Sequence, residues 1–269
     1  MALLRGRGSD TGDAMGNLEG RFALITGGSG GIGRATALEF AREGARGIGV
    51  HYATNRSAAD AVAKEVEAHG AKALPIRADV SKPPEAKRMV DTFVKTFGRL
   101  DALVCCAGHP FRRDEWFAGL EDLAEEMLLR PLRVDLFGSL FAVQAAVPVM
   151  KKQRRGFIVL IGSTPAVTGD IVGLSYLLAK AGVLAATRGL AQILGPHNVH
   201  VNAVALGAID TGAMAVLTKS ERKALADEAA LKRTGDPVEI ARKIVFLCSD
   251  DASFMTGQTL VVDGGYAMR

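Results

Sequence analysis

Short apolar segments alternate with longer amphipathic ones along almost the whole chain, and this alternation restricts the fold more than any other feature. The short segments are rich in β-branched and aliphatic residues and have the length of strands; they span residues 21–26, 47–52, 73–80, 101–108, 157–162, 199–205 and 259–265. Apolar strands separated by helices form parallel sheets that are covered on both sides. The sequence therefore predicts an α/β fold, with a doubly wound seven-stranded parallel sheet and helices on both faces.

Several helix ends are marked by residues with known positional preferences. Ser81 precedes two prolines and predicts the N-cap of a helix that Gly98 ends. The sequence DPVE at residues 236–239 combines an N-cap, a first-turn proline and a capping box, and it predicts a helix start before the last strand.

The composition is that of one globular unit. The chain has 269 residues, of which 48% are hydrophobic and 23% are charged, and it has no visible repeat or linker. Residues 18–269 are therefore expected to form a single domain. Residues 1–17 are rich in Gly, Asp and Arg and lack the apolar core of a signal peptide, so we expect a disordered tail on a cytoplasmic protein. The apolar runs are too short for a membrane span, and none is expected.

Charge and cysteine content argue against several classes of site. The net charge is +4, and the densest basic cluster, residues 151–155, has no interleaved aromatic residues, which favours a helix C-terminus over a nucleic-acid surface. The three cysteines form no CxxC and the five histidines form no HExxH, so no metal site is expected. Cys105 and Cys106 are adjacent on a predicted strand and point to opposite faces, which disfavours a disulfide between them.

The sequence TGGSGGIG, residues 26–33, lies between the first strand and the helix that follows it. Its glycines allow a tight turn and a close approach to a pyrophosphate, which the helix N-terminus attracts. Ligands of doubly wound sheets bind beyond the carboxyl ends of the strands, which is where this turn lies. The stretch therefore predicts a dinucleotide site.

A second group of residues can move a proton. Tyr176 and Lys180 lie four residues apart on one face of a predicted helix. The ammonium stabilises a nearby phenolate, so the pair can act as a general acid towards a carbonyl oxygen or as a base towards an alcohol. Ser163 precedes Tyr176 by thirteen residues, at the end of the fifth strand, where its hydroxyl could contact the same oxygen.

Together these motifs resemble the short-chain dehydrogenase/reductase family across residues 18–269. TGGSGGIG resembles the family's TGxxxGxG cofactor turn, Asp79-Val80 its adenine-side pair, and IGS with YLLAK its Ser–Tyr–Lys catalytic set. Residues 201–211 and 256–266 resemble its VNxVxPGxxxT segment and its last strand. The resemblance implies a Rossmann-like, dinucleotide-binding catalytic domain that transfers hydride between nicotinamide C4 and a carbonyl carbon. It is greatest to the 3-oxoacyl-thioester reductases.

The resemblance also implies roles for individual residues. Tyr176 would be the proton donor, Ser163 would steady the oxygen, Lys180 would bind the nicotinamide ribose, and Asp135 stands in place of the family's catalytic asparagine. The cofactor would contact the glycine turn, the ends of the next three strands, the catalytic helix and the segment after the sixth strand; these contacts are Gly27, Ser29, Gly31, Ile32, Gly33, Tyr52, Asn55, Arg56, Ser57, Asp79, Val80, Cys106, Ala107, Gly108, Tyr176, Lys180, Gly207, Ile209 and Thr211.

Some residues depart from the family pattern. CCAG replaces the usual NNAG, so Cys105 and Cys106 are interpreted as small pocket-wall residues, with a reactive thiol as the alternative. Cys248 lies on an apolar helix face and is expected in the core. Leu206 replaces the proline that usually precedes Gly207.

Asp135 admits two interpretations. Its carboxylate either pairs with Lys180, which would offset the ammonium's field at Tyr176 and favour reduction near neutral pH, or it only caps or hydrogen-bonds its own helix. The segment from residue 108 to residue 135 is longer than is usual in the family. Its His109 and Phe111 either border the substrate pocket or have a structural role.

The leading hypothesis is an NADPH-dependent carbonyl reductase that acts on a ketone such as a 3-oxoacyl thioester, with Tyr176 as general acid. The second strand ends without an acid and Arg56 lies within reach of a 2′-phosphate, so NADP(H) is preferred over NAD(H). Relatives that act on carrier proteins have arginines on two helices, where Ala142 and Gln192 stand here.

Two alternatives stay open: an NAD(P)+-dependent alcohol dehydrogenase for a sugar, polyol or steroid, and a catalytically impaired nucleotide-binding scaffold. The expected partner is a small carbonyl or alcohol substrate, without nucleic acid or membrane. The resemblance implies a homotetramer.

Overall fold

The computed structural model describes residues 16–169 and 173–268. The tail expected over residues 1–17 lies outside these residues except for Gly16 and Asn17. Leu18, the first residue of the expected domain, is already fully buried.

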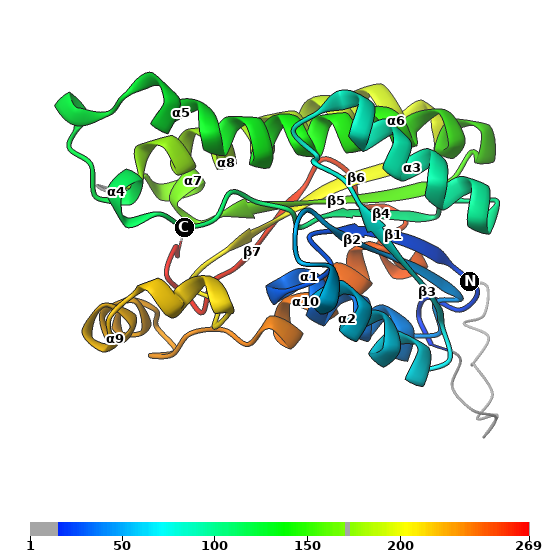
Figure 1. Ribbon diagram of the computed structural model, residues 1–269, viewed down its shortest axis with the longest axis horizontal. Helices are drawn as coiled ribbons and strands as arrows, with labels where there is room; N and C mark the ends of the chain where they lie inside the picture. Colours follow the sequence, from blue (N-terminus) through cyan, green and yellow to red (C-terminus); the bar gives the residue numbers. More distant parts are fainter. Residues whose placement is uncertain (1–15, 170–172, 269) are drawn as a thin grey trace, which may run out of the picture.

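Within the described residues, seven strands form one sheet in the order β3-β2-β1-β4-β5-β6-β7 (Figure 1). The strands are β1 (Phe22–Thr26), β2 (Gly47–Tyr52), β3 (Lys72–Arg77), β4 (Ala102–Cys105), β5 (Gly156–Ser163), β6 (Val199–Leu206) and β7 (Thr259–Val262). All neighbouring strands are parallel, so the predicted doubly wound sheet is confirmed. The strand order reverses between β1 and β4, and ligands of such sheets bind at this reversal.

Helices cover both faces of the sheet, as predicted. Figure 1 shows α1 (Gly31–Arg42), α2 (Arg56–Ala68) and α10 (Pro237–Leu247) on one face, and α3 (Pro83–Phe97), α6 (Gly138–Gln153) and α8 (Leu174–Leu194) on the other. The shorter elements are α4 (Arg113–Trp116), η1 (Leu120–Asp122), α5 (Glu125–Pro131), η2 (Leu132–Phe137), α7 (Pro165–Thr168), η3 (Gly195–His197), η4 (Gly212–Val216), α9 (Lys219–Glu228) and η5 (Asp250–Ala252). Each face of the sheet packs against its helices through its own apolar core.

Two of the three predicted helix ends are confirmed. Asp236 caps α10 and both bonds of its capping box are present, and Gly98 ends α3 in the left-handed conformation with φ of 78°. The predicted Ser81 cap is wrong, because Lys82 occupies the N-cap position of α3. The Ser81 hydroxyl instead donates to the Asp79 carboxylate over 2.6 Å.

A π-helical segment, η2, joins α5 to α6 without a break in the helix. Pro131, the last residue of α5, has no N–H with which to continue the α-helical hydrogen bonds. Such wide turns are frequent at functional sites. This one holds Asp135 in a buried position, with its carbonyl accepting a 2.7 Å hydrogen bond from the Ser139 hydroxyl.

Two helical stretches have the length and composition to cross a membrane, although the sequence predicted no span. They are Glu125–Gln153 and Leu174–His197, with mean hydropathy of 1.4 and 1.3 in their most apolar windows. Both lie over one face of the sheet (Figure 1), where α8 packs on β5 and β6, and α6 packs on α3. Core helices pass the same test of length and composition, which is therefore weak support for a membrane span.

Candidate active site

The glycine turn after β1 is packed tightly against the loop after β4. Gly27 has a φ of 65°, which glycine adopts without strain. A Cβ on Gly27 would come within 2.9 Å of the backbone of Cys106 and Ala107. The Ala107 N–H also donates to the Thr26 hydroxyl over 3.1 Å. The structure thus brings together two of the segments that the sequence assigned to the cofactor.

The N-terminus of α1 fits the pyrophosphate of a dinucleotide. Gly30 occupies the N-cap position without a side-chain cap, and the first turn has no acidic residue. A Cβ on Gly30 would meet nothing within 4 Å, and one on Gly31 would lie 3.6 Å from the Thr211 side chain. The first N–H groups of an uncapped helix need acceptors, and the helix dipole favours an anion there.

The residues predicted for the adenosine side differ in their exposure. Asn55 accepts a 3.0 Å hydrogen bond from the Ala58 N–H and caps α2. Arg56 is exposed and lies 3.3 Å from Asp60 one turn later. Tyr52 is only 5% exposed and packs in the core, which leaves little of its side chain for a ligand. Val80 and Ile209 are also buried. Hydrogen bonds from Ser81 hold the pKa of Asp79 below its ordinary value.

The predicted catalytic residues come from β5 and α8. Ser163 ends β5 beside Leu206 of β6, whose carbonyl its hydroxyl approaches at 3.4 Å. Tyr176 and Lys180 lie in the first two turns of α8, which packs on β5. The Lys180 ammonium is 5.5 Å from the centre of the Tyr176 ring.

Lys180 forms a buried ion pair with Asp135. Its Nζ lies 2.8 Å from Asp135 Oδ1, and the two side chains are 7% and 2% exposed. The ammonium also donates to the Ile161 carbonyl over 3.0 Å, and Asp135 Oδ2 accepts from the His109 N–H over 2.7 Å. Burial alone would lower the pKa of Lys180, but the charges of Asp135 and Tyr176 outweigh it and the pKa is raised. Of the two interpretations of Asp135, the structure shows the pairing.

The comparisons with known proteins agree with this site. A family model described as Enoyl-(Acyl carrier protein) reductase matches residues 27–267. The 3-oxoacyl-[acyl-carrier-protein] reductase FabG of Thermotoga maritima is 38% identical over 248 residues, covering 92% of this chain and 98% of that protein. The L-rhamnose 1-dehydrogenase (NAD(P)(+)) of a Sphingomonas species is 36% identical over 259 residues, covering 92% and 96%. The crystal structure of a short-chain type dehydrogenase/reductase from Mycobacterium marinum superposes with a TM-score of 0.86 at 34% identity, covering 94% of this chain and 97% of that chain.

The chain belongs to the short-chain dehydrogenase/reductase family. It is therefore an NAD(P)(H)-dependent oxidoreductase that acts on CH–OH or C=O groups. This membership leaves the hypothesis of a catalytically impaired scaffold without support.

Two of the cysteines of this dehydrogenase/reductase, Cys105 and Cys248, are buried, and Cys106 is partly exposed. Cys105 packs in the core shared with α6, and Cys106 borders the core on the opposite face of the sheet, as their adjacency predicted. Burial raises the pKa of Cys105, Cys106 and Cys248 to about 12, so all three stay protonated at neutral pH. Raised thiol pKa values count against the reactive-thiol alternative. Only Cys106 borders the cofactor turn, and Cys105 is a core residue.

An aromatic side chain that the sequence analysis gave no role contacts the catalytic tyrosine. The Trp116 ring lies 5.3 Å from the Tyr176 ring and 4.9 Å from Phe111. The Trp116 backbone carbonyl accepts a 2.8 Å hydrogen bond from the Gly173 N–H, and a Cβ on Gly173 would come within 2.9 Å of the indole. The His109 ring instead forms a hydrogen bond with the Glu115 carboxylate, with Nε2 2.9 Å from Oε2. The only sequence signal for Trp116 was its place in the unusually long segment.

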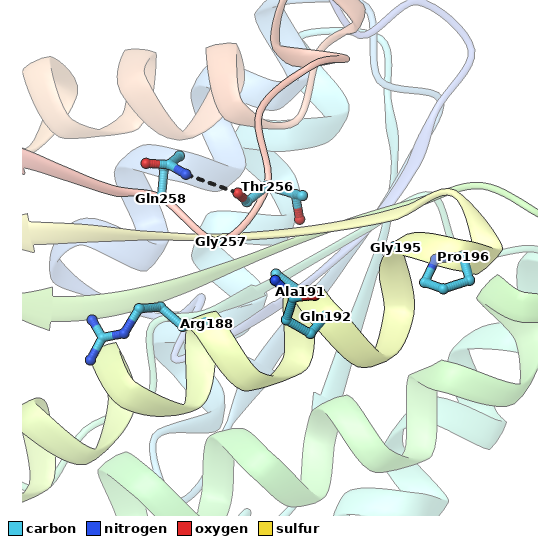
Figure 2. Close-up of a pocket in the computed structure, with 8 residues that line it drawn as sticks. All are labelled: Arg188, Ala191, Gln192, Gly195, Pro196, Thr256, Gly257 and Gln258. Carbon is cyan, nitrogen blue, oxygen red and sulfur yellow. Dashed lines mark hydrogen bonds between the residues drawn. The ribbon is translucent and has the colours of Figure 1, made fainter.

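A pocket of about 440 Å³ lies away from the catalytic residues (Figure 2). It is formed by the C-terminal half of α8 and the loop before β7, and its lining includes Arg188, Gln192 and Gln258. Neither this pocket nor a smaller one beside Ile209 is lined by Ser163 or Tyr176. The location of the chemistry therefore rests on the catalytic residues and not on cavity size.

Proposed function

We propose that this protein is an NADPH-dependent carbonyl reductase that acts on a 3-oxoacyl thioester or a similar ketone. The buried pair of Asp135 and Lys180 carries the proposal. The carboxylate cancels much of the positive field with which the ammonium would stabilise a phenolate at Tyr176. A phenol that keeps its proton is the acid that carbonyl reduction needs. Similarity to 3-oxoacyl-[acyl-carrier-protein] reductases that are 35–38% identical to this chain adds support.

A nicotinamide dinucleotide, held at the glycine turn and by Lys180, would supply the hydride for the carbonyl carbon when bound. Tyr176 donates its proton to the carbonyl oxygen as negative charge develops there. The Ser163 hydroxyl donates a hydrogen bond to the same oxygen. Within the part of the chain that the structure describes, Lys180 has two of its three N–H donors on Asp135 and Ile161, which leaves the third to bind the nicotinamide ribose.

Arg56 is proposed to select NADPH through the 2′-phosphate. The arginine is 75% exposed and, among residues 16–169 and 173–268, pairs with Asp60, so a phosphate can replace or join that partner. Arg77 is a second cation at this edge, with its Nε 3.4 Å from the Ala53 carbonyl.

Arg56→Ala should weaken NADPH binding about tenfold and leave NADH binding unchanged, whereas Lys64→Ala on the same helix should change neither. Dissociation constants from nucleotide fluorescence test this. Equal wild-type affinity for the two cofactors, or no effect of Arg56→Ala, contradicts it.

A second candidate function is oxidation of a sugar or polyol by NAD(P)+. The similarity to an L-rhamnose 1-dehydrogenase, at 36% identity, favours it. The same residues would act in reverse, with Tyr176 as base towards the alcohol.

Ala142 and Gln192 stand where relatives that act on carrier proteins have arginines, but these two positions do not indicate the form of the thioester. Ala142 is fully buried and cannot face a carrier protein, so that comparison was wrong. Gln192 lines the pocket of Figure 2, and Arg188 lies one turn earlier on the same helix.

A spectrophotometric screen at neutral pH tests the proposed function. NADPH consumption would be measured with acetoacetyl thioesters of coenzyme A and of a carrier protein, with diketones and with aldehydes. Reduction of NADP+ and NAD+ would be measured with L-rhamnose, polyols and steroid alcohols. Higher kcat/KM for a 3-oxoacyl thioester than for any alcohol supports the proposal. Turnover only in the oxidative direction favours the second candidate.

We also propose that the enzyme is a cytoplasmic homotetramer. The similarity to 3-oxoacyl reductases supports both features. The absence of nucleic-acid and membrane partners stays a prediction from the sequence.

A further inference from the structure

His51 is a buried polar side chain at the end of an otherwise apolar strand. The residue is 1% exposed and lies in β2, all of whose residues are buried. Both ring nitrogens have backbone partners on neighbouring segments. Nδ1 lies 2.9 Å from the Gly27 nitrogen, and Nε2 lies 3.0 Å from the Ala78 oxygen.

These two partners fix the protonation state of the ring. The Gly27 N–H can only donate, so Nδ1 must be the acceptor. The Ala78 carbonyl can only accept, so Nε2 must carry the proton. The geometry therefore requires the neutral Nε2–H tautomer. If Nδ1 also carried a proton, its N–H would face the Gly27 N–H, and two buried donors without an acceptor between them are unfavourable.

The ring connects two segments that the cofactor needs. Gly27 opens the glycine turn and cannot shift towards the loop after β4, because its Cα already abuts the backbone of Cys106 and Ala107. Ala78 precedes Asp79 in the loop after β3. A single imidazole thus bridges the pyrophosphate side and the adenine side of the predicted dinucleotide site.

We propose that neutral His51 is a positioning residue for the dinucleotide, and that its protonation loosens the glycine turn and weakens cofactor binding in acid. The proposal rests on the dinucleotide occupying the glycine turn, as the family membership implies. His51 does not touch the cofactor in this account; it acts through the Gly27 N–H.

The surroundings of the ring place this transition below the ordinary range of histidine. Burial lowers the pKa of His51, while the hydrogen bond to Ala78 and the charge of Asp79 oppose the change. Asp79, on the loop after β3, is the charged group that acts on the ring. The contacts from the glycine turn and from Ala78 are backbone atoms. We therefore expect cofactor affinity to fall only as the pH drops below about 6.5.

The test measures dissociation constants of NADPH and NADH by nucleotide fluorescence from about pH 8 to pH 5. The wild type should lose affinity for both cofactors in acid. NADH separates this effect from titration of the 2′-phosphate of NADPH, which has a pKa of about 6. His51→Asn keeps an acceptor near the Gly27 N–H but cannot take a proton. It should bind within a few-fold of wild type at neutral pH and lose the acid dependence with NADH.

Two further variants, His51→Ala and His200→Asn, test the same proposal. His51→Ala should bind both cofactors roughly tenfold more weakly at every pH, because the Gly27 N–H loses its acceptor. His200→Asn changes another strand histidine, whose Nδ1 lies 3.2 Å from the Met255 carbonyl, and should keep the wild-type acid dependence. If His51→Ala does not fold, the comparison of His51→Asn with wild type still decides.

Nitrogen NMR of the ring in the free protein gives a readout that does not depend on the cofactor. It should report protonated Nε2 and unprotonated Nδ1 at neutral pH. The opposite tautomer, or the same acid dependence for NADH in wild type and His51→Asn, overturns the proposal. A wild type that binds neither cofactor at neutral pH instead contradicts the proposed function, so the two failures are distinguishable.

Discussion

Lys180 holds its charge throughout the working pH range because Asp135 is buried beside it. A lysine whose pKa is raised in the folded state contributes stability at every pH below its ordinary value of 10.5. That stability is lost only as the pH rises through the raised pKa. Because its pKa is raised, Lys180 keeps its charge at neutral pH.

Replacing Asp135 with Asn should move the oxidation pH–rate profile to lower pH by roughly one unit, because the ammonium's field at Tyr176 is no longer offset. The variant should also lose stability of order 3 kcal/mol, since Lys180 stays buried without its counter-charge and the new amide can face the His109 N–H. pH–rate profiles in both directions and thermal unfolding check this.

Ser139→Ala is the control for this variant. It removes the hydroxyl that bonds the Asp135 carbonyl but keeps the carboxylate, so its pH–rate profile should match wild type. An unmoved profile in Asp135→Asn would mean that the carboxylate has a structural role only.

At the scale of single residues, predictions from the sequence were most accurate where a motif fixes the spacing between the residues. Tyr176 and Lys180 follow from helical periodicity, and pairing of Asp135 with Lys180 was one of two interpretations. Trp116 and His51 were given no role, because their contacts arise only when distant segments pack. A polar residue at the end of an apolar strand was the sole signal for His51.

Among the elements, the strands and two of the three predicted helix ends followed from the sequence, because periodicity and caps are local signals. The strand ends were less accurate, since β3 and β4 stop at Arg77 and Cys105 and leave the cofactor residues beyond them in loops. The π-helical segment η2 was not predicted. Pro131 removes one N–H at this point, but a proline does not by itself distinguish a π-helical turn from a kink or a helix end.

An ion pair joins α9 to α4, the helix whose Trp116 contacts Tyr176, and is expected to hold α4 in place. Arg113 donates to both Glu221 oxygens, over 2.9 and 3.0 Å, and to the Val216 carbonyl over 3.3 Å. Hydrogen bonds from Arg113 and Thr218 lower the pKa of Glu221 to about 2, so the pair is charged at all working pH values. Arg113→Ala should raise the substrate KM a few-fold with little change in kcat, and added salt should reduce the difference.

Glu221→Gln is the matched variant, because glutamine can still complete the capping box of α9. It should raise KM as Arg113→Ala does, and the double variant should be no worse than either single one. Additive effects on KM would show that the two residues act separately.

For the whole molecule, several exposed apolar residues lie on or next to α6, α8 and β7. Phe137 precedes α6, Leu178 and Ile193 lie on α8, and Val261 lies on β7, which is an edge of the sheet. Exposed edges and apolar helix faces are commonly covered by a partner.

Light scattering at micromolar concentration should give four times the chain mass of 28.3 kDa. Ile193→Asp, at a residue that is 61% exposed, should reduce this mass without unfolding the chain, whereas Lys64→Asp on the opposite face should not. A single-chain mass for the wild type would refute the assembly.

The central claim is that carbonyl reduction occurs at Ser163, Tyr176 and Lys180. The most direct measurement is kcat/KM for NADPH-dependent reduction of an acetoacetyl thioester by the wild type and by Tyr176→Phe, with NADPH binding measured in parallel. We expect turnover in the wild type, a loss of about 10²- to 10⁴-fold in the variant, and unchanged NADPH affinity. Full activity in Tyr176→Phe, or a wild type that reduces no carbonyl compound, would contradict the account.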